Sequence, residues 1–229
     1  MPIPQRLPDP PRRPDRFSIF HTSMCWMISL VILGFQWTFG EVQFATHIIT
    51  AHLQGASSAL AIDMDGDGDM DIVASAVWHQ GNVIWFENNG SQSFTTHIIA
   101  DDALGTQSIF AVDMDSDGDM DLLTASGGNH ILFENNGIAW YENDGSESFT
   151  AATITSSADG AQSVYAVDVD GDGDIDVLSA SEVDDTIAWY ENDGSESFTA
   201  HDITISANGA KSVYAVDMDG DGDMDVLSA

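Results

Sequence analysis

The chain has 229 residues, 43% of them hydrophobic, and 38 acidic residues against 5 basic ones give it a formal net charge of −33. Four of the five basic residues precede position 17, so the remainder is almost purely acidic, which excludes nucleic acids and anionic membranes as partners. Such charge with low hydrophobicity would predict disorder, but the apolar residues fall in short regular runs. We therefore expect a folded protein whose acidity requires a cation partner.

The first forty residues have the pattern of an export signal. Residues 1–16 are rich in Pro and Arg, and residues 24–35 (MCWMISLVILGF) form an apolar core of 12 residues. This core is short for a membrane span and fits a signal peptide. We predict a cleaved signal peptide over 1–40, with an uncleaved membrane anchor as the alternative, and a secreted or cell-surface protein. The single cysteine, Cys25, lies in this stretch, so bound metal is the expected cross-link of the rest.

Beyond residue 41 the sequence repeats with a period near fifty residues. The repeated unit is an acidic nonapeptide, Asp-x-Asp-Gly-Asp-Gly-Asp-x-Asp, which begins at Asp63, Asp113, Asp168 and Asp217. Ser116 replaces the first Gly of the second copy. Short apolar runs such as ASSALAI precede each nonapeptide, and runs such as IVASA follow it. Both runs have the β-branched, apolar composition of strands.

An aromatic pair and a turn complete each period. The motif is WFENNG at 85–90 and WYENDG at 140–145 and 189–194, and a run such as SFTTHII follows it. Asn-Gly and Asp-Gly are strong hairpin signals because both tolerate a positive φ. Each period therefore predicts four short strands, and no Pro follows position 14. Four antiparallel strands in forty to fifty residues are typical of a β-propeller blade.

The predicted fold is all-β, a β-propeller with about 3.8 four-stranded antiparallel blades in residues 41–229 and an incomplete ring. The predicted parts are an outer strand in 41–54, blade repeats near 55–104, 105–159 and 160–208, and a partial repeat at 209–229. We interpret the chain as a piece of a longer protein. Within the second repeat, residues 131–137 resemble the third strand that follows at 138–145. Either copy could pair in the blade, leaving the other as a surface loop.

The acidic loops have the chemistry of a calcium site. Like charges about 6 Å apart repel by about 0.7 kcal/mol per pair even in bulk water, so an unliganded loop is held open. Calcium accepts six to eight oxygens in flexible geometry. Positions 1, 3, 5 and 9 would supply carboxylates and position 7 its carbonyl, as in the first part of an EF-hand loop. The flanking strands and the missing twelfth-position Glu argue against an EF-hand itself.

We predict about four calcium ions, one for each loop. The candidate metal residues are the five Asp of each nonapeptide: Asp63, Asp65, Asp67, Asp69, Asp71, Asp113, Asp115, Asp117, Asp119, Asp121, Asp168, Asp170, Asp172, Asp174, Asp176, Asp217, Asp219, Asp221, Asp223 and Asp225.

The stretches SVYAVDVDGDGDIDVLSAS and IAWYENDGSESFTAHDI resemble the FG-GAP/VCBS repeat family, whose blades also form integrin α-subunit propellers. The resemblance covers roughly residues 44–229. It implies a propeller with calcium in the loops that join first and second strands, with ligands at the first, third, fifth and ninth Asp and at the seventh carbonyl. The literal Phe-Gly and Gly-Ala-Pro signatures are absent, so the similarity is to the bacterial-type variant.

Other recurring side chains favour structural roles. We expect the repeated tryptophans to pack between blades, and the histidines of the fourth strands to lie at a surface position rather than to bind zinc. The residues are Trp85, Trp140, Trp189, His47, His97 and His201. A specific ligand would first be sought at the loops between second and third strands, which hold Trp78, His79 and His130.

The sequence contains no nucleophile–base arrangement, phosphate-binding loop or other catalytic motif, so we expect no enzymatic activity from this chain. The expected function is a secreted calcium-binding module that binds an extracellular protein or glycan. The alternative is an accessory propeller of a larger secreted enzyme or surface protein whose catalytic part is missing here.

Overall fold

The computed structural model describes residues 45–50, 52–77, 81–127 and 136–229. One compact unit spans His47–Ala229, and the described part of it contains strands and turns. Over those ranges, no helix is both long and apolar enough to cross a membrane.

Three sheets have four strands each, in chain order and with antiparallel neighbours. The first contains β1 (Ala56–Ile62), β2 (Asp71–Ala76), β3 (Val83–Asn88) and β4 (Phe94–Ala100). The second contains β5 (Thr106–Val112), β6 (Asp121–Gly127), β7 (Asn136–Asn143) and β8 (Phe149–Thr155). The third contains β9 (Ala161–Val167), β10 (Asp176–Ser181), β11 (Thr186–Asn192) and β12 (Phe198–Thr204), and a two-stranded sheet follows with β13 (Val213–Val216) and β14 (Asp225–Ser228). The prediction of an all-β fold built from four-stranded antiparallel blades is therefore confirmed.

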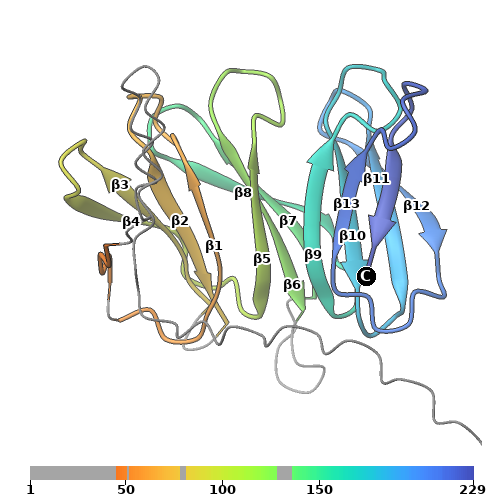
Figure 1. The fold of residues 1–229 in the computed structure, drawn as a ribbon, viewed down its shortest axis with the longest axis horizontal. Coiled ribbons are helices and arrows are strands. Elements are labelled where there is room, and N and C mark those ends of the chain that lie inside the picture. Colours follow the sequence, from red (N-terminus) through yellow and green to blue (C-terminus); the bar gives the residue numbers. More distant parts are fainter. Residues whose placement is uncertain (1–44, 51, 78–80, 128–135) are drawn as a thin grey trace, which may run out of the picture. The chain divides into compact units, whose positions relative to one another are not determined.

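The sheets stand side by side, so each blade covers its neighbour (Figure 1). Their first strands lie against one another: the Tyr165 ring on β9 lies 4.9 Å from Phe110 on β5 and 4.8 Å from Tyr214 on β13. The second strands of the four-stranded sheets, β2, β6 and β10, are almost entirely buried, and every residue of β10 is buried. The outer strands β4, β8 and β12 keep many exposed residues, as expected for the edge of each blade.

The repeated tryptophans belong to the core between blades. Trp85 and Trp140 are each 1% exposed. Trp85 packs in one apolar cluster with Leu122 and Tyr141 of the second blade, and Trp140 packs with Tyr190 of the third. Burial of one such aromatic side chain contributes on the order of 4 kcal/mol. The third member, Trp189, is only partly buried.

Two local features differ from, or go beyond, the sequence interpretation. The second copy of the duplicated strand forms β7, while residues 131–135 of the first copy lie outside the described residues. The outer strand expected in 41–54 is not found: residues 45–50 and 52–54 form no strand, and 41–44 and 51 are not described. An outer strand pairs with the third strand of a blade, and the last sheet has only two strands in the described part of the chain.

Candidate metal sites

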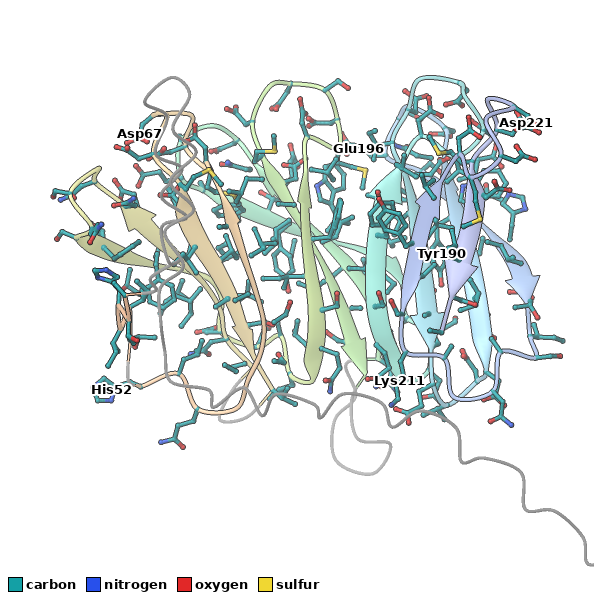
Figure 2. The ribbon with its side chains drawn as sticks, in the orientation of Figure 1. His52, Asp67, Tyr190, Glu196, Lys211 and Asp221 are labelled. Carbon is teal, nitrogen blue, oxygen red and sulfur yellow. The ribbon has the colours of Figure 1, made fainter. Side chains whose placement is uncertain are left out.

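The four acidic loops occupy the same place in every blade, between the first and second strands. Asp67 of the first loop and Asp221 of the last loop lie at the same end of the strands, and His52 and Lys211 lie at the opposite end (Figure 2). All four candidate sites therefore lie at one end of the strands.

Each loop curls through two left-handed residues. In the first loop, Gly66 and Gly68 have φ of 73° and 96°. The curl lets carboxylates accept bonds from nearby backbone amides: Gly68 N donates to Asp63 Oδ2 (3.0 Å) and Asp67 N donates to Asp65 Oδ1 (3.1 Å). The same two bonds, and one from the seventh amide to the fifth carboxylate, recur in the other loops at 2.9–3.2 Å. The backbone thus fixes the first, third and fifth carboxylates.

Each loop brings three carboxylates together, with one oxygen from each lying within 4.8 Å of the others. In the first loop these are the first, third and fifth Asp; in the other three they are the first, third and ninth. The groups are Asp63, Asp65 and Asp67; Asp113, Asp115 and Asp121; Asp168, Asp170 and Asp176; and Asp217, Asp219 and Asp225. Such a triad can hold a metal ion.

In two loops, one carboxylate oxygen of the first Asp has no hydrogen-bond partner. Asp63 Oδ1 and Asp113 Oδ1 are buried and have no hydrogen-bond partner among the described residues. In the third and fourth loops the corresponding oxygen accepts the fourth-position amide, at 2.7 Å from Gly171 N and 2.6 Å from Gly220 N. A buried carboxylate oxygen without a partner is costly. A cation at that oxygen removes the cost, so the donor set fits a metal.

In the three four-stranded blades the ninth Asp is buried at the start of the second strand, whereas Asp225 of the last sheet is exposed. Asp71 and Asp121 are fully buried and Asp176 is 1% exposed. In each case Oδ1 accepts a backbone N–H from the end of the third strand, as Asn143 N donates to Asp121 at 2.8 Å. Oδ2 accepts the N–H of the second loop residue, for example Met114 N to Asp121 at 3.0 Å. The ninth Asp therefore links the loop to two strands of its blade.

The first blade uses its ninth Asp differently. Trp85 Nε1 donates to Asp71 Oδ2 at 3.0 Å, in addition to Met64 N at 3.1 Å. The indole nitrogens of Trp140 and Trp189 are also buried and lie near the ninth Asp of their blades, Asp121 and Asp176, but they fall outside hydrogen-bond geometry.

Burial changes the acidity of these carboxylates. Burial raises the pKa of Asp121 from 3.8 to about 6, against the opposing effect of the Asn143 and Met114 N–H donors. Burial also raises the pKa of Asp176. For Asp65 and Asp115, partial burial and the neighbouring loop carboxylates raise the pKa. A bound cation would favour the ionised forms and reverse these shifts.

The seventh Asp points its carboxylate at the hairpin turn of its own blade. A Cβ built on Gly145 would lie 2.3 Å from Asp119 Oδ2, and one on Gly90 would lie 2.4 Å from Asp69 Oδ2. Gly194 and Asp174 have the same relation in the third blade, at 2.5 Å. The turn glycines are thus required both for their positive φ and for this close approach.

A set of asparagines also organises the loops, and sequence reasoning missed its role. The Asn of the ENNG and ENDG motifs donates Nδ2 to the eighth carbonyl of the loop, at 3.1 Å from Asn88 to Met70 O. Asn143 and Asn192 do the same at 3.2 and 3.1 Å. The motif was interpreted only as a hairpin turn. The one signal for this role was the recurrence of Asn at the same distance from each acidic loop.

Carboxylates of neighbouring blades meet beside the first loop. Asp65, Asp67, Asp119 and Glu147 line a cavity of about 320 Å³. His97 lies close by, with Nε2 at 2.8 Å from Glu87 and Nδ1 at 3.7 Å from Glu147 of the next blade. Its ring stacks on Trp85 at 4.5 Å, as His201 stacks on Trp189 at 4.7 Å. These histidines lie on the outer strands β4 and β12, as expected for a surface strand position, and they also pack against the repeated tryptophans of their own blades.

Several residues singled out from the sequence lie outside the described part of the chain. Trp78, His79 and His130, the residues of the loops first considered for ligand binding, lie outside the described residues, as does the predicted signal segment 1–40.

Comparison with known proteins gives a family match. A family model described as FG-GAP-like repeat matches residues 63–124, 128–179 and 168–228. No curated protein matches the chain. Among solved structures, rhamnogalacturonan lyase YesW is similar over 76% of this chain, with 14% sequence identity and a TM-score of 0.49. The similar region covers 40% of the lyase, so this chain spans less than half of that protein's length.

Proposed function

Since the chain belongs to the FG-GAP-like repeat family, we propose that it is a calcium-binding repeat module in which each acidic loop holds one calcium ion. The observation that carries this proposal is a carboxylate triad in each of the four acidic loops, built on the first and third Asp in every case. The buried, unpartnered oxygens of Asp63 and Asp113 support it.

The donor chemistry favours calcium over other metals. The triads offer only carboxylate oxygens, which suit hard cations rather than zinc or copper. Calcium takes six to eight oxygens at flexible angles, whereas magnesium requires a strict octahedron. A nine-residue loop with five carboxylates and two left-handed residues can supply many oxygens without a rigid octahedral frame. In this proposal the ligands are the first, third, fifth and ninth carboxylates and the seventh carbonyl.

Calcium would act as a cross-link of this chain, whose described residues contain no cysteine. Each ion offsets the repulsion within one loop, and in the three four-stranded blades it connects the first, second and third strands through the ninth Asp and its Asn partner. Four ions would lower the net negative charge by eight and leave a strongly acidic surface.

We further propose that the module is exported, is non-catalytic and binds an extracellular protein or glycan. The apolar segment at 24–35 and the absence of a catalytic motif in the sequence support this role. An array of glycans and extracellular proteins, probed with the purified chain with and without calcium, tests it. Calcium-dependent capture of one ligand class is expected, and no binding to either class would contradict it.

Calorimetric titration of the chelator-treated protein tests the metal sites. We expect about four calcium sites, with weaker binding of magnesium. The Asp168→Ala variant should lose one site and keep the others, because each repeat mainly contacts its neighbours. Asp202→Ala, which removes an exposed carboxylate of β12 outside any loop, is the matched control and should keep all sites. Absence of binding heat in the parent protein would contradict the proposal.

A further inference from the structure

The turn between β3 and β4 contains an exposed Asn89–Gly90 pair. We propose that Asn89 is a site of spontaneous deamidation, in which the Gly90 amide nitrogen attacks the carbonyl carbon of the Asn89 side chain. Glycine is the least hindered residue that can follow the asparagine, since it has no Cβ. The inference is independent of metal binding and rests on the geometry of this turn.

The side-chain carbonyl of Asn89 is activated by two donors. Ser91 N donates to Asn89 Oδ1 at 3.1 Å, and the Ser91 hydroxyl donates to the same oxygen at 2.6 Å. Attack on the carbonyl carbon places negative charge on Oδ1. Hydrogen-bond donors already aimed at that atom stabilise the charge as it forms.

The attacking nitrogen is less restrained in this blade than in the other two. In the second blade the Gly145 amide donates to Asn143 Oδ1 at 3.2 Å, and in the third Gly194 donates to Asn192 at the same distance. In the first blade Asn88 Oδ1 is buried and accepts no bond from the described residues. The Gly90 amide is therefore not held by this acceptor, and its proton can be lost to solvent.

The reaction needs water and no other co-reactant. Gly90 N loses its proton to solvent base and the N–Cγ bond forms; Nδ2 then takes a proton from solvent, and the bond from Cγ to Nδ2 breaks as ammonia leaves. The product is a five-membered succinimide. Water then adds to one of its two carbonyls, which gives aspartate with the original backbone or isoaspartate with one more backbone carbon.

The other blades show that the turn accommodates the aspartate product. Asp144 and Asp193 occupy the corresponding position in the second and third blades. Asp144 accepts the same two bonds, from Ser146 N at 2.9 Å and from its hydroxyl at 2.6 Å. Deamidation to aspartate thus converts the first turn into the form that the sequence already contains twice, and adds a charge next to Gly90, which touches Asp69 of the first loop.

Two other Asn-Gly pairs provide internal comparisons. The Gly209 amide, after Asn208, donates to Asp185 Oδ1 at 2.8 Å, so this nitrogen is held by an acceptor and is not free to attack. Asn136 and Gly137 lie in the ladder of β7, and a Cβ on Gly137 would lie 2.0 Å from Thr155 O. The Asn136–Gly137 pair is therefore held in an extended strand rather than in a turn, and its side-chain amide donates to Asp159 Oδ1 at 3.1 Å.

Peptide mapping by mass spectrometry, after the full chain is incubated in mildly alkaline buffer, tests the proposal. Asn89 should convert at least about tenfold faster than Asn136 and Asn208, since only its turn combines the two donors with an unrestrained nucleophile. Similar rates at the three sites, or slower conversion at Asn89, would overturn it.

Two variants test separately the role of the Ser91 donors and the ability of the turn to accept aspartate. Ser91→Ala removes the hydroxyl donor and should slow conversion at Asn89 without changing the rates at the other two sites; an unchanged Asn89 rate would refute the role of the donors. Asn89→Asp should unfold at the same temperature as the parent protein. A marked loss of thermal stability in that variant would contradict the claim that the turn accepts the product.

Discussion

At the scale of single residues, the loops depend on left-handed backbone at their fourth and sixth positions. Ser116 adopts φ of 63° where the other loops have glycine, and a side chain in this region costs roughly 1 kcal/mol. The position is not one of the expected side-chain ligands. The second loop therefore carries backbone strain that the other three avoid.

This strain predicts opposite effects for two matched substitutions. Ser116→Gly should raise the free energy of unfolding by about 1 kcal/mol, and Gly66→Ala, whose added Cβ meets no atom within 4 Å, should lower it by about 1 kcal/mol. Urea unfolding in chelator measures both. Destabilisation by Ser116→Gly would show that the serine side chain makes a contribution larger than the strain.

The buried ninth Asp predicts a pH dependence with a definite sign. The pKa of Asp121 is raised from 3.8 to about 6, so the folded protein binds this proton more tightly than the unfolded chain. In chelator, the stability contributed by Asp121 is present below about pH 4 and is lost as the pH rises through about 6. Calcium requires the ionised form, so calcium affinity should instead rise with pH over this range.

The difference between the parent protein and Asp121→Asn isolates this contribution from that of the many other acids. In chelator, the urea midpoint of the parent should fall between pH 4 and 6 by more than that of the variant. If the two profiles are parallel, the pKa of Asp121 is not raised on folding.

At the scale of strands and turns, the sequence was informative wherever a loop or hairpin motif bounded an apolar run. The run ASSALAI coincides with β1 (Ala56–Ile62), because an acidic loop follows it and a glycine precedes it. The choice between the two copies of the third strand was not predictable, since both have suitable local composition. Pairing decides it: Ile138 is 1% exposed, and Tyr141 lies opposite Leu122 on β6.

The site was predictable in part for the same reason. Spacing alone indicated the acidic triads, because alternating carboxylates and glycines act within one loop. The Asn143 bonds to the second loop and the contact of Gly145 with Asp119 depend on two segments more than twenty residues apart. Such contacts arise from strand pairing and have no local signal.

The contact between turn and loop predicts an excess cost at one glycine. Gly145→Ala and Gly118→Ala both place a side chain at positive φ, 72° and 102°, and each should cost about 1 kcal/mol from strain. Only Gly145→Ala also brings a Cβ to 2.3 Å from Asp119 Oδ2, so it should cost about 1 kcal/mol more. Urea unfolding of both variants measures the difference.

A double variant identifies the source of that excess. Asp119→Ala should remove the additional cost of Gly145→Ala and leave the strain. If Gly145→Ala lowers the free energy of unfolding equally with and without Asp119→Ala, the additional destabilisation comes from a contact other than Asp119.

At the scale of the whole molecule, repulsion among the acidic loops opposes the fold, and cations at the four triads would reduce that repulsion. The loops contain twenty of the 38 acidic residues and lie at one end of the strands. The apolar clusters between blades hold neighbouring repeats together, while repulsion within and between loops opposes that packing. Divalent cations at the triads would relieve the repulsion where it is strongest.

The thermal midpoint of the chelator-treated full chain, measured as calcium is added back, tests this account most directly. One site contributes about 2.7 kcal/mol when calcium is a hundredfold above its dissociation constant, so the midpoint should rise steadily with calcium concentration. A variant with Asn at the first Asp of all four loops should show little response. An unchanged midpoint in the parent protein, or an equal rise in that variant, would contradict the account.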